Sequence, residues 1–149
     1  MKKLIALFMP AFMSVAQASD VTGTWVTIDD ETGEKKSVVE IYEFEGATFG
    51  RVIHLFKNAD KTAENVKGSP KILGLDILWG LKAEDGKYKG GKILDPKKGK
   101  IYNAEIWREG DNLIVRGKIA FLGRNQTWLK DTEFKTSKNM TPVIPELED

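Results

Sequence analysis

From Val21 to Lys130 the chain is a series of short runs in which apolar and polar residues alternate, and Gly, Asp and Asn residues separate these runs. No window in this region has the 3.6-residue periodicity of an amphipathic helix. Each run has about 6 to 10 residues, which is a typical length for an antiparallel β-strand. The pattern therefore predicts an all-β fold.

Eight strands are predicted, and most of them are joined by short turns. Their ranges are 22–28, 37–44, 48–56, 77–83, 88–94, 100–108, 113–122 and 125–130. An open meander of eight strands exposes two edges, and closure into a barrel removes both. We therefore expect an eight-stranded up-and-down antiparallel barrel over residues 19–130. The polar residues 131–149 are expected to form a loosely ordered C-terminal tail.

The first eighteen residues have the layout of a secretory signal peptide. Residues 1–3 (Met-Lys-Lys) form a short positively charged region, residues 4–15 are mostly apolar, and residues 16–18 are a small-x-small cleavage site. The apolar stretch is shorter than the roughly 20 residues that a membrane-spanning helix needs. We expect cleavage after Ala18, no transmembrane segment in the mature chain, and a periplasmic or secreted protein. The absence of Cys suits a Gram-negative periplasm.

Composition excludes several classes of function. With no Cys and a single His, His54, the chain has no thiol nucleophile, no Cys-ligated zinc and no site with two His ligands. A formal net charge of +1 gives no general attraction to nucleic acid or to anionic membranes. The sequence also lacks a nucleophile–base constellation. We therefore expect no enzymatic activity, no catalytic residues, no metal site, no cofactor and no nucleic-acid partner.

A signal peptide followed by eight strands also occurs in outer-membrane barrels. Such a barrel needs a lipid-facing apolar band on one face of every strand. Lys89 and Lys92 lie in the same predicted strand and point to opposite faces under two-residue alternation. They break the band on both faces, so the pattern favours a soluble barrel.

Gly23, Thr24 and Trp25, at the start of the first strand, resemble the Gly-x-Trp signature of lipocalins and the related calycins. In that superfamily the Trp closes one end of the barrel, and an Arg from a late strand lies over its ring. Arg124 precedes the last predicted strand, where that Arg is expected. The resemblance implies that Trp25 and Arg124 form the barrel floor through a cation–π contact. The alternative is a core Trp with an unrelated surface Arg.

Aromatic residues in other predicted strands are candidates for the lining of a ligand cavity. They are Trp79, Tyr88, Tyr102, Trp107 and Trp128. Ligand pockets are mostly apolar with a few polar groups, so we expect a small apolar or amphipathic ligand. Small barrels are commonly packed solid, and in that alternative the rings only fill the core. The protein would then be a non-enzymatic envelope interaction module that acts through its rim loops.

Successive motifs resemble one exported bacterial family, domain of unknown function 2147 (DUF2147). The most specific are residues 90–96 (Gly-Gly-Lys-Ile-Leu-Asp-Pro) and residues 123–128 (Gly-Arg-Asn-Gln-Thr-Trp). The resemblance runs from Gly23 to Trp128 and implies an exported lipocalin-like barrel of unassigned activity. Family members often carry a Cys pair after the third strand. This chain has none there, so no disulfide or redox role is expected.

Overall fold

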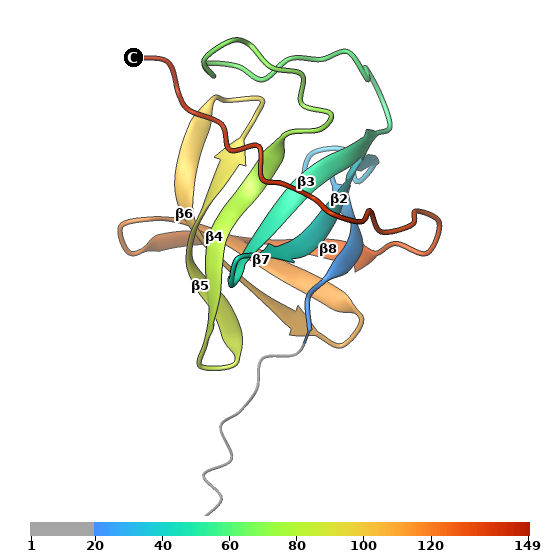
Figure 1. Cartoon of the computed structure of the whole chain (residues 1–149), viewed down its shortest axis with the longest axis vertical. Helices are drawn as coiled ribbons and strands as arrows, with labels where there is room; N and C mark the ends of the chain where they lie inside the picture. Colours follow the sequence, from blue (N-terminus) through green and yellow to red (C-terminus); the bar gives the residue numbers. More distant parts are fainter. Residues whose placement is uncertain (1–19) are drawn as a thin grey trace, which may run out of the picture.

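The computed structural model describes residues 20–149, and the expected signal peptide lies outside the described residues. Eight strands pair in sequence order and form one closed antiparallel barrel (Figure 1). The strands are β1 (Gly23–Ile28), β2 (Lys35–Phe44), β3 (Ala47–Leu55), β4 (Asp76–Glu84), β5 (Lys87–Asp95), β6 (Lys100–Glu109), β7 (Asn112–Ile119) and β8 (Leu122–Lys130). This confirms the predicted all-β up-and-down barrel.

The barrel closes where β1 meets β8. Trp25 pairs with Lys130 and Val26 pairs with Leu129. The ladder continues past the end of β8, because the Asp131 N–H donates to the Thr24 carbonyl. The distance of 3.0 Å is typical of a backbone hydrogen bond. Closure leaves neither β1 nor β8 as an unpaired edge.

The connections alternate between the two ends of the barrel because the strands alternate in direction. We call one end the mouth: it carries the β1–β2 turn, the long β3–β4 connection, the β5–β6 turn and the β7–β8 turn. The β3–β4 connection and the β5–β6 turn lie together at the top of Figure 1. The opposite end, which holds the start of β1 and the other three turns, is the floor.

The β7–β8 turn differs from its predicted position. The sequence places the turn at Gly123, whereas the structure turns at Ala120 and Phe121, and Ala120 has a positive φ of 53°. Neither residue is a usual turn former. The two strands are therefore paired up to an apolar tip, where the Phe121 side chain is 89% exposed.

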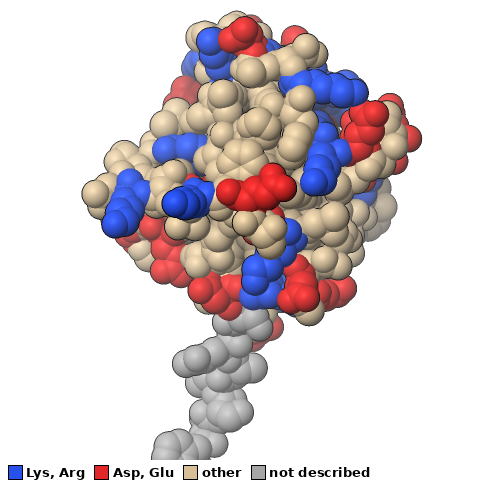
Figure 2. Space-filling model, turned by 90° about the vertical axis from the view of Figure 1, so that its right-hand side faces the viewer, with Lys and Arg blue, Asp and Glu red and all other residues tan. Residues whose placement is uncertain are grey.

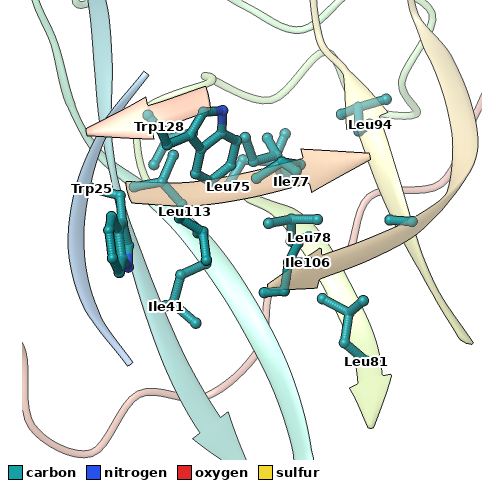
Figure 3. Close-up of a cluster of buried hydrophobic side chains, with 14 of the residues drawn as sticks. Trp25, Ile41, Leu75, Ile77, Leu78, Leu81, Leu94, Ile106, Leu113 and Trp128 are labelled. Atoms are coloured by element: carbon teal, nitrogen blue, oxygen red, sulfur yellow. The ribbon is translucent and has the colours of Figure 1, made fainter. Parts of the chain in front are cut away.

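Large apolar side chains fill the half of the barrel nearest the floor. Trp25, Ile41, Leu81, Ile106 and Leu113 are all buried and lie toward the floor ends of their strands. Figure 3 shows these side chains converging, with Trp128 above Leu113. Their dense packing makes this half a solid core, and burial of such side chains contributes about 1.5–3 kcal/mol each.

Residues 131–149 lie along the outer wall of the barrel rather than forming the loosely ordered tail that we expected. In Figure 1 this segment crosses in front of β3 and β4. The Ser137 N–H donates to both carboxylate oxygens of Glu40, and the Val143 N–H donates to Asp76 at 2.6 Å. Both carboxylates are buried, and a buried charge needs hydrogen-bond donors. The tail supplies these donors from its backbone.

Asp76 has two further partners on this wall. The Tyr42 hydroxyl donates to Asp76 Oδ2 at 2.7 Å, and the Arg51 Nε lies 3.3 Å from Asp76 Oδ1. Burial raises the pKa of Asp76, while the hydrogen bonds from Tyr42 and Val143 and the charge of Arg51 oppose that rise. Burial also raises the pKa of the Tyr42 hydroxyl. The cluster joins β2, β3, β4 and the tail.

Candidate functional site

A cavity of about 510 Å³ occupies the half of the barrel nearest the mouth. Its deep wall is formed by side chains that are both buried and apolar: Val52, Ile77, Leu94, Val115 and Trp128. Ligand pockets typically measure about 300–1,000 Å³ and have mostly apolar walls. The cavity is therefore large enough for a small organic molecule.

The polar groups of the deep wall are few, and several are paired with each other. The Trp128 indole N–H donates to Gln126 Oε1 at 3.3 Å, and the hydroxyls of Thr27 and Ser37 lie 2.6 Å apart. Gly117 also lines the cavity, and a Cβ added there would meet Ile93 and Tyr102 at the ordinary contact distance of 3.7 Å. A ligand in this region meets mainly hydrocarbon.

Charged residues surround the cavity at the mouth, with seven basic and four acidic side chains in its lining. Two of the acids form ion pairs: Glu34 with Lys57 at 2.7 Å and Asp30 with Arg124 at 2.8 Å. The hydrogen bond to Glu34 raises the pKa of Lys57. The mouth is thus polar and predominantly basic, whereas the depth is apolar.

The other two acids of the mouth are engaged by backbone N–H groups. Asp29 accepts hydrogen bonds from the N–H groups of Thr32 and Glu31, and these bonds lower the pKa of Asp29. Asp95 accepts hydrogen bonds from the N–H groups of Lys97 and Lys98 at 3.0 and 3.1 Å. Both carboxylates therefore stabilise their own turns.

The floor is closed by Trp25, as the sequence predicts, but with a different arginine. The Trp25 indole N–H donates to the Val21 carbonyl at 2.9 Å, and the Arg108 guanidinium lies 5.6 Å from the centre of the Trp25 ring. Arg124 lies at the mouth and is paired with Asp30. The prediction for Arg124 is wrong because β8 runs from the mouth to the floor and Arg124 lies near its start. The end of β6 places Arg108 beside the start of β1.

Comparison with known proteins agrees with this architecture. The family described as an uncharacterized protein conserved in bacteria (DUF2147) matches residues 23–130. The chain belongs to the DUF2147 family. No curated protein matches this DUF2147 chain.

This DUF2147 protein is similar to one solved structure. That structure is protein HP1028 from the human pathogen Helicobacter pylori, which is described as belonging to the lipocalin family. The TM-score is 0.64 and the sequence identity is 22%, and the match covers 76% of this chain and 84% of that chain. The likeness shows a lipocalin-like fold.

Two of the five aromatic residues proposed for the cavity lie in its lining. Tyr102 and Trp128 line it, and Trp128 is fully buried at its base. Trp107 lies on the outer wall, where its ring is covered by the Lys87 ammonium at 3.9 Å and its N–H donates to Glu109. The neighbouring residue, Ile106, faces the core, so alternation turns Trp107 outward.

The remaining two aromatic residues belong to the packing of the barrel. Tyr88 is buried in the core, and burial raises the pKa of its hydroxyl. Trp79 is half-buried and packs against the same core without lining the cavity. The deep lining is instead mostly aliphatic. Its signal in the sequence is ordinary strand alternation, which leaves open the question of which face turns inward.

Within residues 20–149, no three His, Cys, Asp or Glu side chains gather as potential metal ligands. The same part of the chain contains no helix that is long and apolar enough to cross a membrane. The arrangement that stands out is the cavity itself, with an apolar base and a charged mouth.

Proposed function

We propose that this DUF2147 protein is a non-enzymatic binding protein that carries a small apolar or amphipathic ligand in its cavity. The observation that carries the proposal is the volume of about 510 Å³ above the buried Trp128, walled by apolar side chains. The signal-peptide layout of residues 1–18 supports a periplasmic or secreted site of action. The cavity counts against an interaction module with a solid core, because only the half nearest the floor is packed solid.

A neutral apolar fluorophore, N-phenyl-1-naphthylamine, tests this proposal. Its emission rises when it leaves water for an apolar site. We expect saturable binding of one probe per chain, with energy transfer from tryptophan to the probe because Trp128 lines the cavity. A titration in which probe fluorescence never saturates, or saturates only with unfolded protein, would show that the cavity does not bind apolar molecules.

A further inference from the structure

We propose that the ligand is an amphiphile with an anionic head group. Its hydrocarbon chain lies in the apolar depth of the cavity, and its head group lies among four lysines at the mouth, which we call the mouth lysines: Lys36, Lys61, Lys97 and Lys98. This inference rests on the proposed carrier function and adds the chemical class of the ligand.

The mouth lysines are the cations that the protein itself leaves without a partner there. Of the seven basic residues in the lining, Lys57 and Arg124 are ion-paired, and the Lys35 ammonium lies over the Phe56 ring at 5.9 Å. Within the described residues, the mouth lysines form no salt bridge. The charge of Lys36 also acts on Asp29 and helps to lower the pKa of that carboxyl. With seven basic and four acidic side chains, the lining still has an excess of positive charge, which an anion would complement.

The backbone holds the mouth lysines in place from three directions. Lys36 lies on β2, Lys61 lies in the β3–β4 connection, and the other two lie in the β5–β6 turn. The connection and the turn are bonded to each other: the Glu64 N–H donates to the Pro96 carbonyl at 2.9 Å, and the Asn65 side chain donates to the Gly99 carbonyl at 3.2 Å. Fixed backbone positions reduce the entropy lost when the lysines close around a head group.

A close approach of the turn and the connection is built into the sequence at Gly99. Its φ is 64°, and an added Cβ would come within 2.5 Å of the Glu64 carbonyl oxygen. Only glycine fits this position without strain. The residue therefore keeps Lys97 and Lys98 next to the connection that carries Lys61.

The depth of the cavity excludes a charged head group. An unpaired ion in an apolar environment is strongly destabilised, and the deep wall has no cation to neutralise it. Among the described residues, the buried polar atoms without a hydrogen-bond partner are Arg51 Nε and Asp76 Oδ1, which lie outside the cavity lining. A charged group must therefore stay at the mouth while the chain enters.

The excess of free positive charge is a local property of the mouth. Over the face of the molecule shown in Figure 2, basic and acidic side chains are interspersed. The chain as a whole carries a formal net charge of only +1. Like charges that converge at the opening of a low-dielectric cavity focus their field there, which favours entry of an anion over a cation.

Three amphiphiles with the same chain test this inference: dodecanoate, dodecanol and dodecyltrimethylammonium. Each amphiphile is titrated at neutral pH into protein that carries bound N-phenyl-1-naphthylamine, and loss of probe fluorescence reports displacement. The amphiphile is kept below the concentration at which it aggregates. We expect dodecanoate to bind about tenfold more tightly than dodecanol, and the cation to bind most weakly. The advantage of dodecanoate is expected to shrink as salt concentration rises, because the mouth lysines are exposed.

Substitutions of two mouth lysines test whether these residues cause the preference for an anionic head group. The double variant Lys97→Gln/Lys98→Gln is expected to weaken dodecanoate binding about fivefold and to leave dodecanol binding unchanged. The double variant Lys97→Arg/Lys98→Arg keeps the charge and is expected to bind as the wild type does. Lys82→Gln is a matched control, because Lys82 is exposed and lies outside the cavity lining.

The outcomes separate this inference from the function on which it rests. Equal affinity for dodecanoate and dodecanol, in protein that still binds the neutral probe, would overturn the anionic head group and leave the carrier function standing. Failure of the neutral probe and all three amphiphiles to bind would overturn both. Displacement of the probe by acetate as effective as that by dodecanoate would identify a site for free anions, and the inference would be wrong.

Discussion

Replacing Gly117 by Trp is expected to weaken binding of the neutral probe about tenfold or more while leaving the barrel folded. Gly117 lies in β7 and lines the cavity. Gly117 does not have a positive φ, so its backbone conformation is open to residues other than glycine. An indole at this position projects into the space that the ligand is proposed to occupy.

The same position supplies its own control. In Gly117→Ala the new methyl group meets Ile93 and Tyr102 at an ordinary contact distance of 3.7 Å. We expect this variant to bind the probe within about twofold of the wild type. Circular dichroism and a thermal melt report whether either variant is folded. Wild-type affinity in folded Gly117→Trp would mean that the probe binds elsewhere, and the cavity would lose its assigned role.

Removal of residues 135–149 is expected to lower the free energy of unfolding by about 3 kcal/mol. This truncation removes the N–H groups of Ser137 and Val143, which donate to the buried carboxylates of Glu40 and Asp76. Water then replaces protein donors on the barrel wall, and the apolar contacts of the tail are lost as well. Urea unfolding monitored by tryptophan fluorescence measures the change.

Shorter truncations locate the source of the loss. Deletion of Asp149 alone is expected to change the free energy of unfolding by less than about 0.5 kcal/mol. Removal of residues 146–149 also breaks the bonds from Lys67 to Glu146 and from Glu148 to Asn65, and we expect a loss of about 1–2 kcal/mol. If the longest truncation unfolds at the same urea concentration as the full chain, the tail does not stabilise the barrel.

The tail shows a kind of order that a sequence pattern does not reveal. Residues 131–149 are polar and hold two Pro residues, which is typical of weakly ordered segments. Their order comes from backbone N–H groups that meet Glu40 and Asp76 on distant strands. Such a contact depends on where the barrel wall buries a carboxylate. The composition of the tail alone does not predict that position.

The barrel itself follows from local chemistry because its strands alternate and most of its turns carry Gly, Asp or Asn. The Glu45–Gly46 hairpin is an example, since both residues adopt positive φ. The exception is the turn at Ala120 and Phe121, which has no such residue. Gly123 was the stronger local signal, yet the structure pairs it with Lys118 inside the hairpin.

The floor and the cavity lining depend on topology, and that limits what sequence reasoning can achieve. Trp25 was predicted from its motif, but its cation, Arg108, could be found only by knowing that β6 ends where β1 begins. Trp107 was expected inside and lies outside, because alternation alone fixes two faces without saying which one is internal. The strand and the two connections that carry the mouth lysines are likewise far apart in the chain.

A crystal structure of the protein purified from its own bacterium would show whether the cavity holds a ligand. We expect continuous density for an elongated molecule above Trp128, between Val52 and Val115, with its polar end among the mouth lysines. A cavity collapsed by rotation of these side chains, with no room for a ligand, would contradict the carrier function.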